Sequence, residues 1–175
     1  MKMSTFLDKK IVFSLLILVV GFVADPVLAA CPSSGLAASS GATDINGDCA
    51  VVGDINLSGS ATLTMSNGNL SVTGKIILQE NSVPSVTTAT LTFPQTNFSQ
   101  YSIKLNGQSQ FIMTDSTFVT NATIQNPTEV YPFDASKISV SSSSFATTWL
   151  NFAPGNTGIV NIPKLDDQAK FYIYT

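Results

Sequence analysis

Two groups of carboxylates in the chain have spacings that could carry chemistry. The segment Asp44-Ile-Asn-Gly-Asp48 has oxygen-bearing side chains at its first, third and fifth positions, as a calcium-binding loop does. Such a loop continues with Gly at position 6 and an acid at position 12, where this chain has Cys49 and Ile55. We therefore interpret the segment as an Asn-Gly turn before a strand, and we expect no metal site and no cofactor.

The second group is the adjacent pair Asp166 and Asp167, because glycoside hydrolysis uses two carboxylates. Neighbouring residues of a strand point to opposite faces, and the surrounding sequence is typical of a solvated turn. The chain has no His, and its eight basic residues are all Lys. Ser-His-Asp and Cys-His mechanisms are therefore excluded, as are His-based metal sites. We expect no catalytic residues.

Aromatic side chains offer a different kind of chemistry, the stacking of rings on sugars. Leu150 and Phe152 have the alternation expected of inward residues, which predicts that Trp149 and Asn151 lie outside. An exposed Trp on a rigid sheet can stack on a sugar ring, and Tyr131 and Phe133 in a nearby long turn add to such a platform. The candidate ligand-binding residues are Trp149, Asn151 and Tyr131. The alternative is a Trp149 packed beneath that turn.

These residues must be positioned by a mature domain that follows an export signal. Lys9 and Lys10 precede an apolar run from Ile11 to Ala24, and small residues follow up to Ala30. This three-part layout predicts a signal peptide over residues 1–30. A tilted membrane anchor is the alternative, although a spanning helix needs about 20 residues. We expect secretion, or a periplasmic or cell-surface location.

The two cysteines, Cys31 and Cys49, have two alternative fates. An exported protein meets an oxidising compartment, which favours a disulfide between them that staples the start of the domain. The sequence Leu28-Ala29-Ala30-Cys31 also resembles a lipobox, which would attach a lipid to Cys31 and hold the protein at a membrane. Lipidation would leave Cys49 without a partner, so we favour the disulfide.

The charge of the mature chain argues against two classes of partner. Without residues 1–30 it carries five lysines and nine carboxylates. Nucleic acids and anionic lipids require clustered positive charge, so we expect neither as a partner. Ser, Thr and Asn dominate the remaining surface, which suits a polysaccharide or a cell-surface component.

The strands that position these residues are short and repeated. From Ala50 onward, apolar and polar residues alternate with period two, and no stretch has a helical period. Residues 55–70 align without a gap on residues 103–118, with Ile55, Leu57, Gly59 and Met65 recurring at an offset of 48. A shorter apolar pattern starts at residues 63, 91, 111 and 138, each time followed by an apolar residue seven positions later.

This repetition predicts coils that stack at about 4.8 Å with parallel pairing of equivalent strands. The starting positions of the shorter pattern are separated by unequal numbers of residues. This predicts turns that bulge outward, one over Glu80 to Thr87 with Pro84 and another over Asn126 to Asp134. An apolar pair is expected to follow the last residue of each pattern, at Ile76 and Leu78, at Ile103 and Leu105, at Ala122 and Ile124, and at Leu150 and Phe152.

The pattern resembles the right-handed parallel β-helix, or pectin-lyase-like, superfamily between Ala50 and about Phe152. The resemblance rests on repeat texture, and it implies an all-β, right-handed parallel β-helix of roughly five coils with a disulfide in its N-terminal part. The domain boundaries that follow are a signal peptide at 1–30, a polar lead-in and cap at 31–49, and a β-helix domain at 50–175. An antiparallel β-sandwich is the alternative fold.

From these observations we expect a non-catalytic exported β-helix protein that serves surface attachment or carbohydrate contact. One alternative is a polysaccharide lyase or glycosidase on the same scaffold, which in the resembled superfamily uses an Arg or Lys base. Another is the N-terminal fragment of a longer β-helix protein. Lys170 to Thr175 reads as a final strand, so end-to-end β contacts with another chain are expected at that C-terminal edge.

Overall fold

The computed structural model describes residues 31–97, 100–120, 128–145, 148–152, 159–161 and 170–173, and from residue 145 onward it describes the backbone pairing alone. The described residues form eighteen strands and no helix. None of them belongs to a helix that could span a membrane. The strands belong to three sheets, which we call A, B and C, and the strand pairs of the described residues are parallel.

Sheet B contains seven strands in spatial order: β1 (Leu36–Ala38), β4 (Ile55–Leu57), β7 (Ile76–Leu78), β10 (Ser102–Leu105), β13 (Thr128–Pro132), β16 (Thr148–Phe152) and β18 (Lys170–Ile173). Sheet A contains six: β2 (Ala42–Asn46), β5 (Thr62–Ser66), β8 (Val83–Thr87), β11 (Gln110–Thr114), β14 (Lys137–Ser141) and β17 (Ile159–Asn161). Sheet C contains five: β3 (Cys49–Val51), β6 (Asn69–Val72), β9 (Thr90–Phe93), β12 (Thr117–Thr120) and β15 (Ser144–Phe145).

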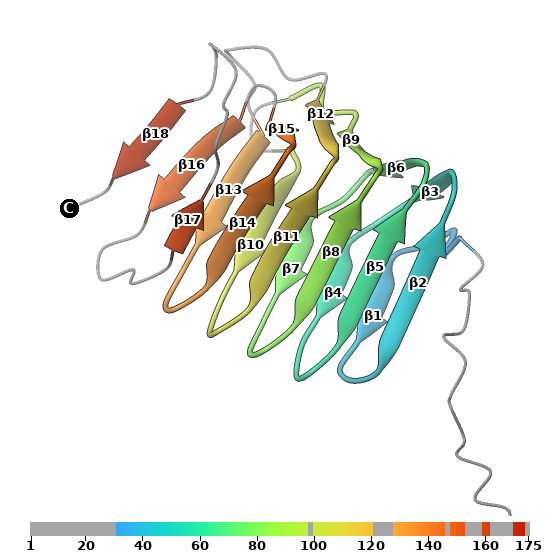
Figure 1. The fold of residues 1–175 in the computed structure, drawn as a ribbon, viewed down its shortest axis with the longest axis horizontal. Coiled ribbons are helices and arrows are strands. Elements are labelled where there is room, and N and C mark those ends of the chain that lie inside the picture. Colours follow the sequence, from blue (N-terminus) through green and yellow to red (C-terminus); the bar gives the residue numbers. More distant parts are fainter. Residues whose placement is uncertain are drawn as a thin grey trace, which may run out of the picture.

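Each coil takes one strand from sheet B, one from sheet A and one from sheet C, and the next coil repeats this order. Five coils, β1–β3 to β13–β15, have all three strands, and β16, β17 and β18 continue the stack. Figure 1 shows the coils advancing along the long axis, from the blue strands β1 and β2 to the red strand β18. The predicted all-β parallel β-helix of roughly five coils is confirmed.

The core is built from rows of equivalent residues that stack from coil to coil. Ile55 pairs with Ile76, and Ile76 with Ile103, and all three are fully buried. Burial alternates along the strands because successive side chains point to opposite faces of a sheet. The two steps span 21 and 27 residues, so the gap-free repeat at an offset of 48 covers two coils.

The corner from sheet A to sheet C has the same length in every described coil. Its first residue has a positive φ each time, between 48° and 93°, and these residues are Gly47, Asn67, Thr88, Asp115 and Ser142. In the second coil, the second residue of the corner lies against the first coil. A Cβ on Gly68 would stand 2.2 Å from the carbonyl carbon of Gly47, so this corner requires glycine there.

The corner from sheet B to sheet A is a four-residue turn after β4, β7, β10 and β13. Gly59, Glu80, Gly107 and Asp134 take the left-handed conformation in this turn. The two acidic residues also accept hydrogen bonds from the preceding coil. The Gly59 N–H donates to Glu80 Oε2 at 2.6 Å, and the Gly107 N–H donates to Asp134 Oδ2 at 2.9 Å.

The corner from sheet C to sheet B changes in length. It spans three residues after β3 and after β6, and residues 94–101 after β9. This extension accounts for the longer third coil, since Ile55 and Ile76 are 21 residues apart while Ile76 and Ile103 are 27 apart. The varying step therefore lies in a turn, as predicted, but the long turns were assigned to the wrong segments.

Two predicted bulges are in fact strands. Residues 83–87 form β8, and Pro84 is buried beside Leu63. The missing N–H of Pro84 is tolerated because β8 begins to pair with its other neighbour, β11, only at Ser85. Residues 128–132 likewise form β13, in which Val130 pairs with Ile103.

The shorter apolar pattern was aligned incorrectly at one position. Leu91 pairs with Leu70 in sheet C, so the pattern starting at residue 91 does not repeat the one starting at residue 63. The predicted pair Ala122 and Ile124 lies outside the described residues. The row of Ile103 continues instead through Val130.

The first coil begins inside the segment predicted to be a polar lead-in, because β1 and β2 precede residue 49. The predicted disulfide between Cys31 and Cys49 is present, with a Cα–Cα distance of 5.4 Å. Cys49 is buried in β3, whereas Cys31 is exposed. The bridge therefore fastens the segment before β1 to the last strand of the same coil.

Candidate functional site

The outer face of sheet B carries small, polar, apolar, cationic and aromatic side chains. Its central column runs from strand to strand through Ala37, Asn56, Ile77, Lys104 and Tyr131, which are paired in register. None of these side chains belongs to the buried core, because their neighbours on each strand, such as Ile55 and Leu57, point inward. The column thus changes from small and polar at β1 to cationic and aromatic at β13.

An aromatic group lies at the β13 end of this column. The rings of Tyr131 and Phe133 are nearly parallel, with planes 1° apart and centroids 6.1 Å apart. The Lys104 ammonium lies over the Tyr131 ring, 5.5 Å from its centroid. Both rings are partly exposed. Parallel rings beside a cationic donor can offer an apolar surface and a hydrogen bond to the same polar ligand.

Sequence reasoning placed Tyr131 in a long turn, and this was wrong, since it belongs to strand β13. The next strand of sheet B is β16, which contains Trp149 and Asn151. Trp149 pairs with Glu129, and Asn151 pairs with Tyr172 of β18. The backbone therefore brings all three predicted ligand-binding residues onto two neighbouring strands, although only the Tyr131 side chain is described.

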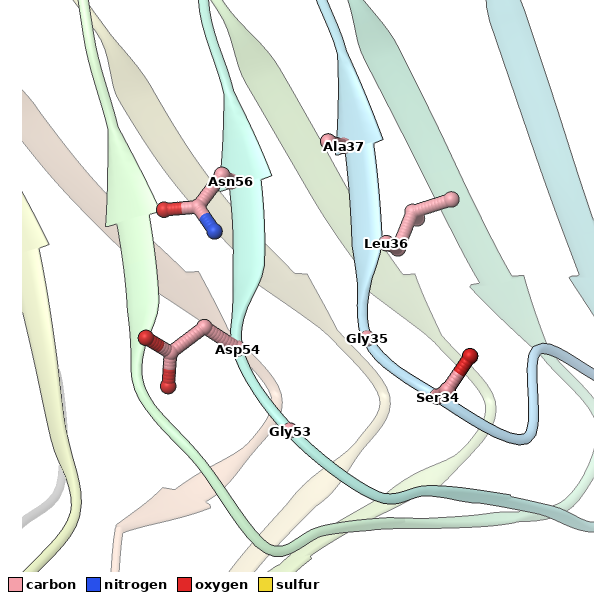
Figure 2. Close-up of a pocket in the computed structure, with 7 residues that line it drawn as sticks. All are labelled: Ser34, Gly35, Leu36, Ala37, Gly53, Asp54 and Asn56. Atoms are coloured by element: carbon pink, nitrogen blue, oxygen red, sulfur yellow. The ribbon is translucent and has the colours of Figure 1, made fainter.

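A shallow hollow lies at the opposite end of the face, over β1 and β4 (Figure 2). Its walls are Ser34, Asp54 and Asn56, and its floor is low because Gly35, Ala37 and Gly53 are small. Figure 2 shows the Asp54 and Asn56 side chains on the same side of their strand, both leaning away from β1. Asp54 Oδ1 accepts a hydrogen bond of 2.7 Å from the Lys75 N–H of the next coil.

The extended corner 94–101 borders the face where the chain enters β10. Its conformation is held by two glutamines. Gln95, which is 1 % exposed, accepts hydrogen bonds through Oε1 from the Tyr101 N–H at 3.2 Å and from the Thr128 hydroxyl at 3.4 Å. Gln100 Oε1 accepts from the Thr96 N–H at 2.9 Å and from the Thr96 hydroxyl at 3.1 Å.

The same corner has an aromatic anchor. The Tyr101 ring stacks near Phe93, with centroids 6.2 Å apart, and Phe93 meets Phe118 edge-on at 5.4 Å. Ser102 and Glu129 alternate with inward residues of sheet B, yet they are only 3 % and 6 % exposed. Sequence reasoning missed Gln95, Gln100 and Glu129, because the lengthening of the coil at this corner was not located.

The described residues that were considered for metal binding are not gathered into a site. Asp44 lies on β2, and Asp48 Oδ1 accepts a hydrogen bond of 2.8 Å from the Asn69 N–H. Asp48 therefore stabilises the next coil. Among the described residues, no three His, Cys, Asp or Glu side chains gather as metal ligands would. Asp166 and Asp167 lie outside the described residues.

Comparisons with known proteins add no assignment. No protein-family model, no curated protein and no solved structure matches the chain. The functional interpretation therefore depends on the fold and on the outer face of sheet B.

Proposed function

We propose that this chain is a non-catalytic exported β-helix protein that contacts carbohydrate through the outer face of sheet B, in the service of surface attachment. The observation that carries the proposal is the pair of parallel, partly exposed rings of Tyr131 and Phe133 with the Lys104 ammonium beside it. Aromatic rings on a rigid strand lose little conformational entropy when they stack on a sugar.

Trp149 and Asn151 extend this proposal to the neighbouring strand. Their strand, β16, pairs directly with β13, so a ligand that covers Tyr131 also reaches them. The hollow beside Asp54 and Asn56 supplies carboxylate and amide groups, which suit sugar hydroxyls. A polymer that lies along the molecular axis would contact both ends of the face.

The proposal includes export and a place in the pectin-lyase-like superfamily. The Cys31–Cys49 disulfide supports an oxidising compartment, so we propose a secreted, periplasmic or cell-surface location. A lipid on Cys31 would need the sulfur that the disulfide uses, and for this reason we favour the unlipidated form. The three parallel sheets support the superfamily assignment.

The test is retention of the mature chain, from Cys31 onward, on a panel of insoluble polysaccharides, with new chain ends measured in the same samples. We expect retention on at least one polysaccharide without an increase in chain ends. Tyr131→Ala and Phe133→Ala should each weaken retention about tenfold, which corresponds to roughly 1.4 kcal/mol. The matched control is Val52→Ala, which removes an exposed apolar side chain from another part of the surface.

Two outcomes would overturn the proposal. Equal retention of the two aromatic variants and the wild type would remove the site from the outer face of sheet B. Release of new chain ends would make the protein an enzyme of the lyase or glycosidase type, and the lysines with Asp166 and Asp167 would then be the residues to substitute first.

A further inference from the structure

In the described part of the chain, sheet B has an open edge at each end, β1 at one and β18 at the other. The Leu36 N–H donates to the Asp54 carbonyl at 2.9 Å, and the Ala38 carbonyl accepts from the Ser58 N–H at 2.9 Å. Backbone groups of a parallel strand alternate between its two neighbours. The N–H and C=O of Ala37 therefore point away from β4, toward the open edge, where a further strand could pair with them.

The outer side of the β1 edge is hollowed as well as open. One hollow is bounded by Gly35, Ala37 and Asp54, and a second one lies over Ala38, Ser39 and Ser58. The two hollows share Ala37 and Asn56, so they form one shallow groove along β1. A strand that brings a large side chain to the position beside Ala37 would fill this groove.

The rows of sheet B specify which residues could take these positions. One row runs without interruption through Leu36, Ile55, Ile76, Ile103, Val130, Leu150 and Phe171. Its members at β4, β7, β10 and β13 are all fully buried. A strand that is added to β1 with its apolar residues in the core must therefore continue this row.

We propose that β18 of one copy of this chain pairs in parallel with β1 of a second copy, so that sheet B continues from molecule to molecule. If the row continues from one copy into the next, position 171 of the first copy lies beside Leu36 of the second copy. Position 172, a Tyr, then falls beside Ala37, the small residue that both hollows share. Position 170, a Lys, falls beside Gly35, so the added strand is complementary to the groove in size.

The contact has a defined extent. Among the described residues sheet A has six strands, sheet C has five and sheet B has seven, so the described strands that meet in this contact belong to sheet B alone. A single pair of short strands buries little surface, which makes the association weak and dependent on concentration. Because the two ends of sheet B differ, the contact is heterologous and extends into linear chains instead of closed dimers.

The first experiment is a disulfide trap between two variants of the full mature chain. Ala37→Cys and Tyr172→Cys are mixed under mild oxidation, since neighbouring strand positions about 4.8 Å apart fall within the range of Cα–Cα distances of disulfides. We expect a cross-linked heterodimer from this pair. The control pairs Ala37→Cys with Ser144→Cys, an exposed position in sheet C. Cross-linking no faster than in this control overturns the proposal.

The second experiment measures association without a covalent trap. Sedimentation velocity over a concentration series should show wild-type chains growing beyond the monomer. Ala37→Pro removes the one N–H of β1 that points to the open edge and leaves the hydrogen bonds of Leu36 and Ala38 to the second coil intact, so it should remain monomeric. Ala37→Ser keeps that N–H and adds little volume to the groove, so it serves as the control. A wild type that stays monomeric at every concentration, or an Ala37→Pro variant that associates equally well, contradicts the proposal.

Discussion

Two corners of this β-helix, each of which joins one sheet to the next, differ in length and in the contacts that hold them. The corner from sheet A to sheet C is short and constant, and it is packed so closely that Gly68 lies against Gly47. The corner from sheet C to sheet B varies between coils, and residues 94–101 are held by the side chains of Gln95 and Gln100. Constant corners keep the coils in register, while the variable corner can change without moving the strands.

The largest effect that this comparison predicts is for Gly68→Ala. The new Cβ would meet backbone atoms 2.2 Å away that no side-chain rotation can relieve, so we expect a loss of about 3 kcal/mol or more in the free energy of unfolding. Denaturant unfolding followed by circular dichroism measures this loss.

The matched control at the same corner is Gly47→Ala. Gly47, unlike Gly68, has a positive φ, and a Cβ there has nothing within 4 Å, so the substitution should cost only the backbone strain of a left-handed alanine, about 1–2 kcal/mol. If both variants lose equal stability, close packing is not what keeps this corner constant.

A smaller effect is expected in the variable corner. Gln95→Ala removes the acceptor of the Tyr101 N–H and of the Thr128 hydroxyl in a buried setting, which should cost about 2 kcal/mol. Gln100→Ala removes bonds that are more exposed, and about 1 kcal/mol is expected. Thermal unfolding of both variants tests the order, and a larger loss for Gln100→Ala would show that the corner is anchored at its exposed side.

The smallest effect concerns a carboxylate in the constant corner. Asp48→Ala deletes the acceptor of the Asn69 N–H at an exposed site, so we expect a loss of about 0.5–1 kcal/mol. Asp48→Asn keeps an oxygen in the same position and should recover most of that loss. A loss as large as that of Gly68→Ala would mean that side-chain capping, and not backbone packing, holds the corner.

The sequence predicted the architecture because the core has a strict period of two. The recurrence of Ile55 as Ile103 indicated stacked coils, and the cysteine pair indicated the disulfide correctly. The alternation of apolar residues does not show which sheet a strand joins. Leu91 was therefore matched to Leu63 although it pairs with Leu70.

The prolines were the second source of error. Pro84 and the segment 126–134, which contains Pro132, were predicted to lie in turns. Both prolines lie within strands, where the missing N–H falls beyond the residues that pair with one of the two neighbouring strands. The candidate site was predicted in part, since Tyr131, Trp149 and Asn151 were named and their strands are adjacent. Gln95 and Lys104 were not named as residues of the binding site. The role of Gln95 depends on the conformation of the corner and that of Lys104 on the register of the strands, and neither residue belongs to a sequence motif.

The disulfide has a mechanical consequence for the end of the molecule. Cys31 precedes β1 and Cys49 begins β3, so the bridge closes most of the first coil into a covalent ring. The bonds between coils run along the long axis, and a pull on the chain before Cys31 would otherwise peel β1 and then β2 away in sequence. With the ring closed, that tension passes directly to β3, and the first coil must detach from β4, β5 and β6 as one unit.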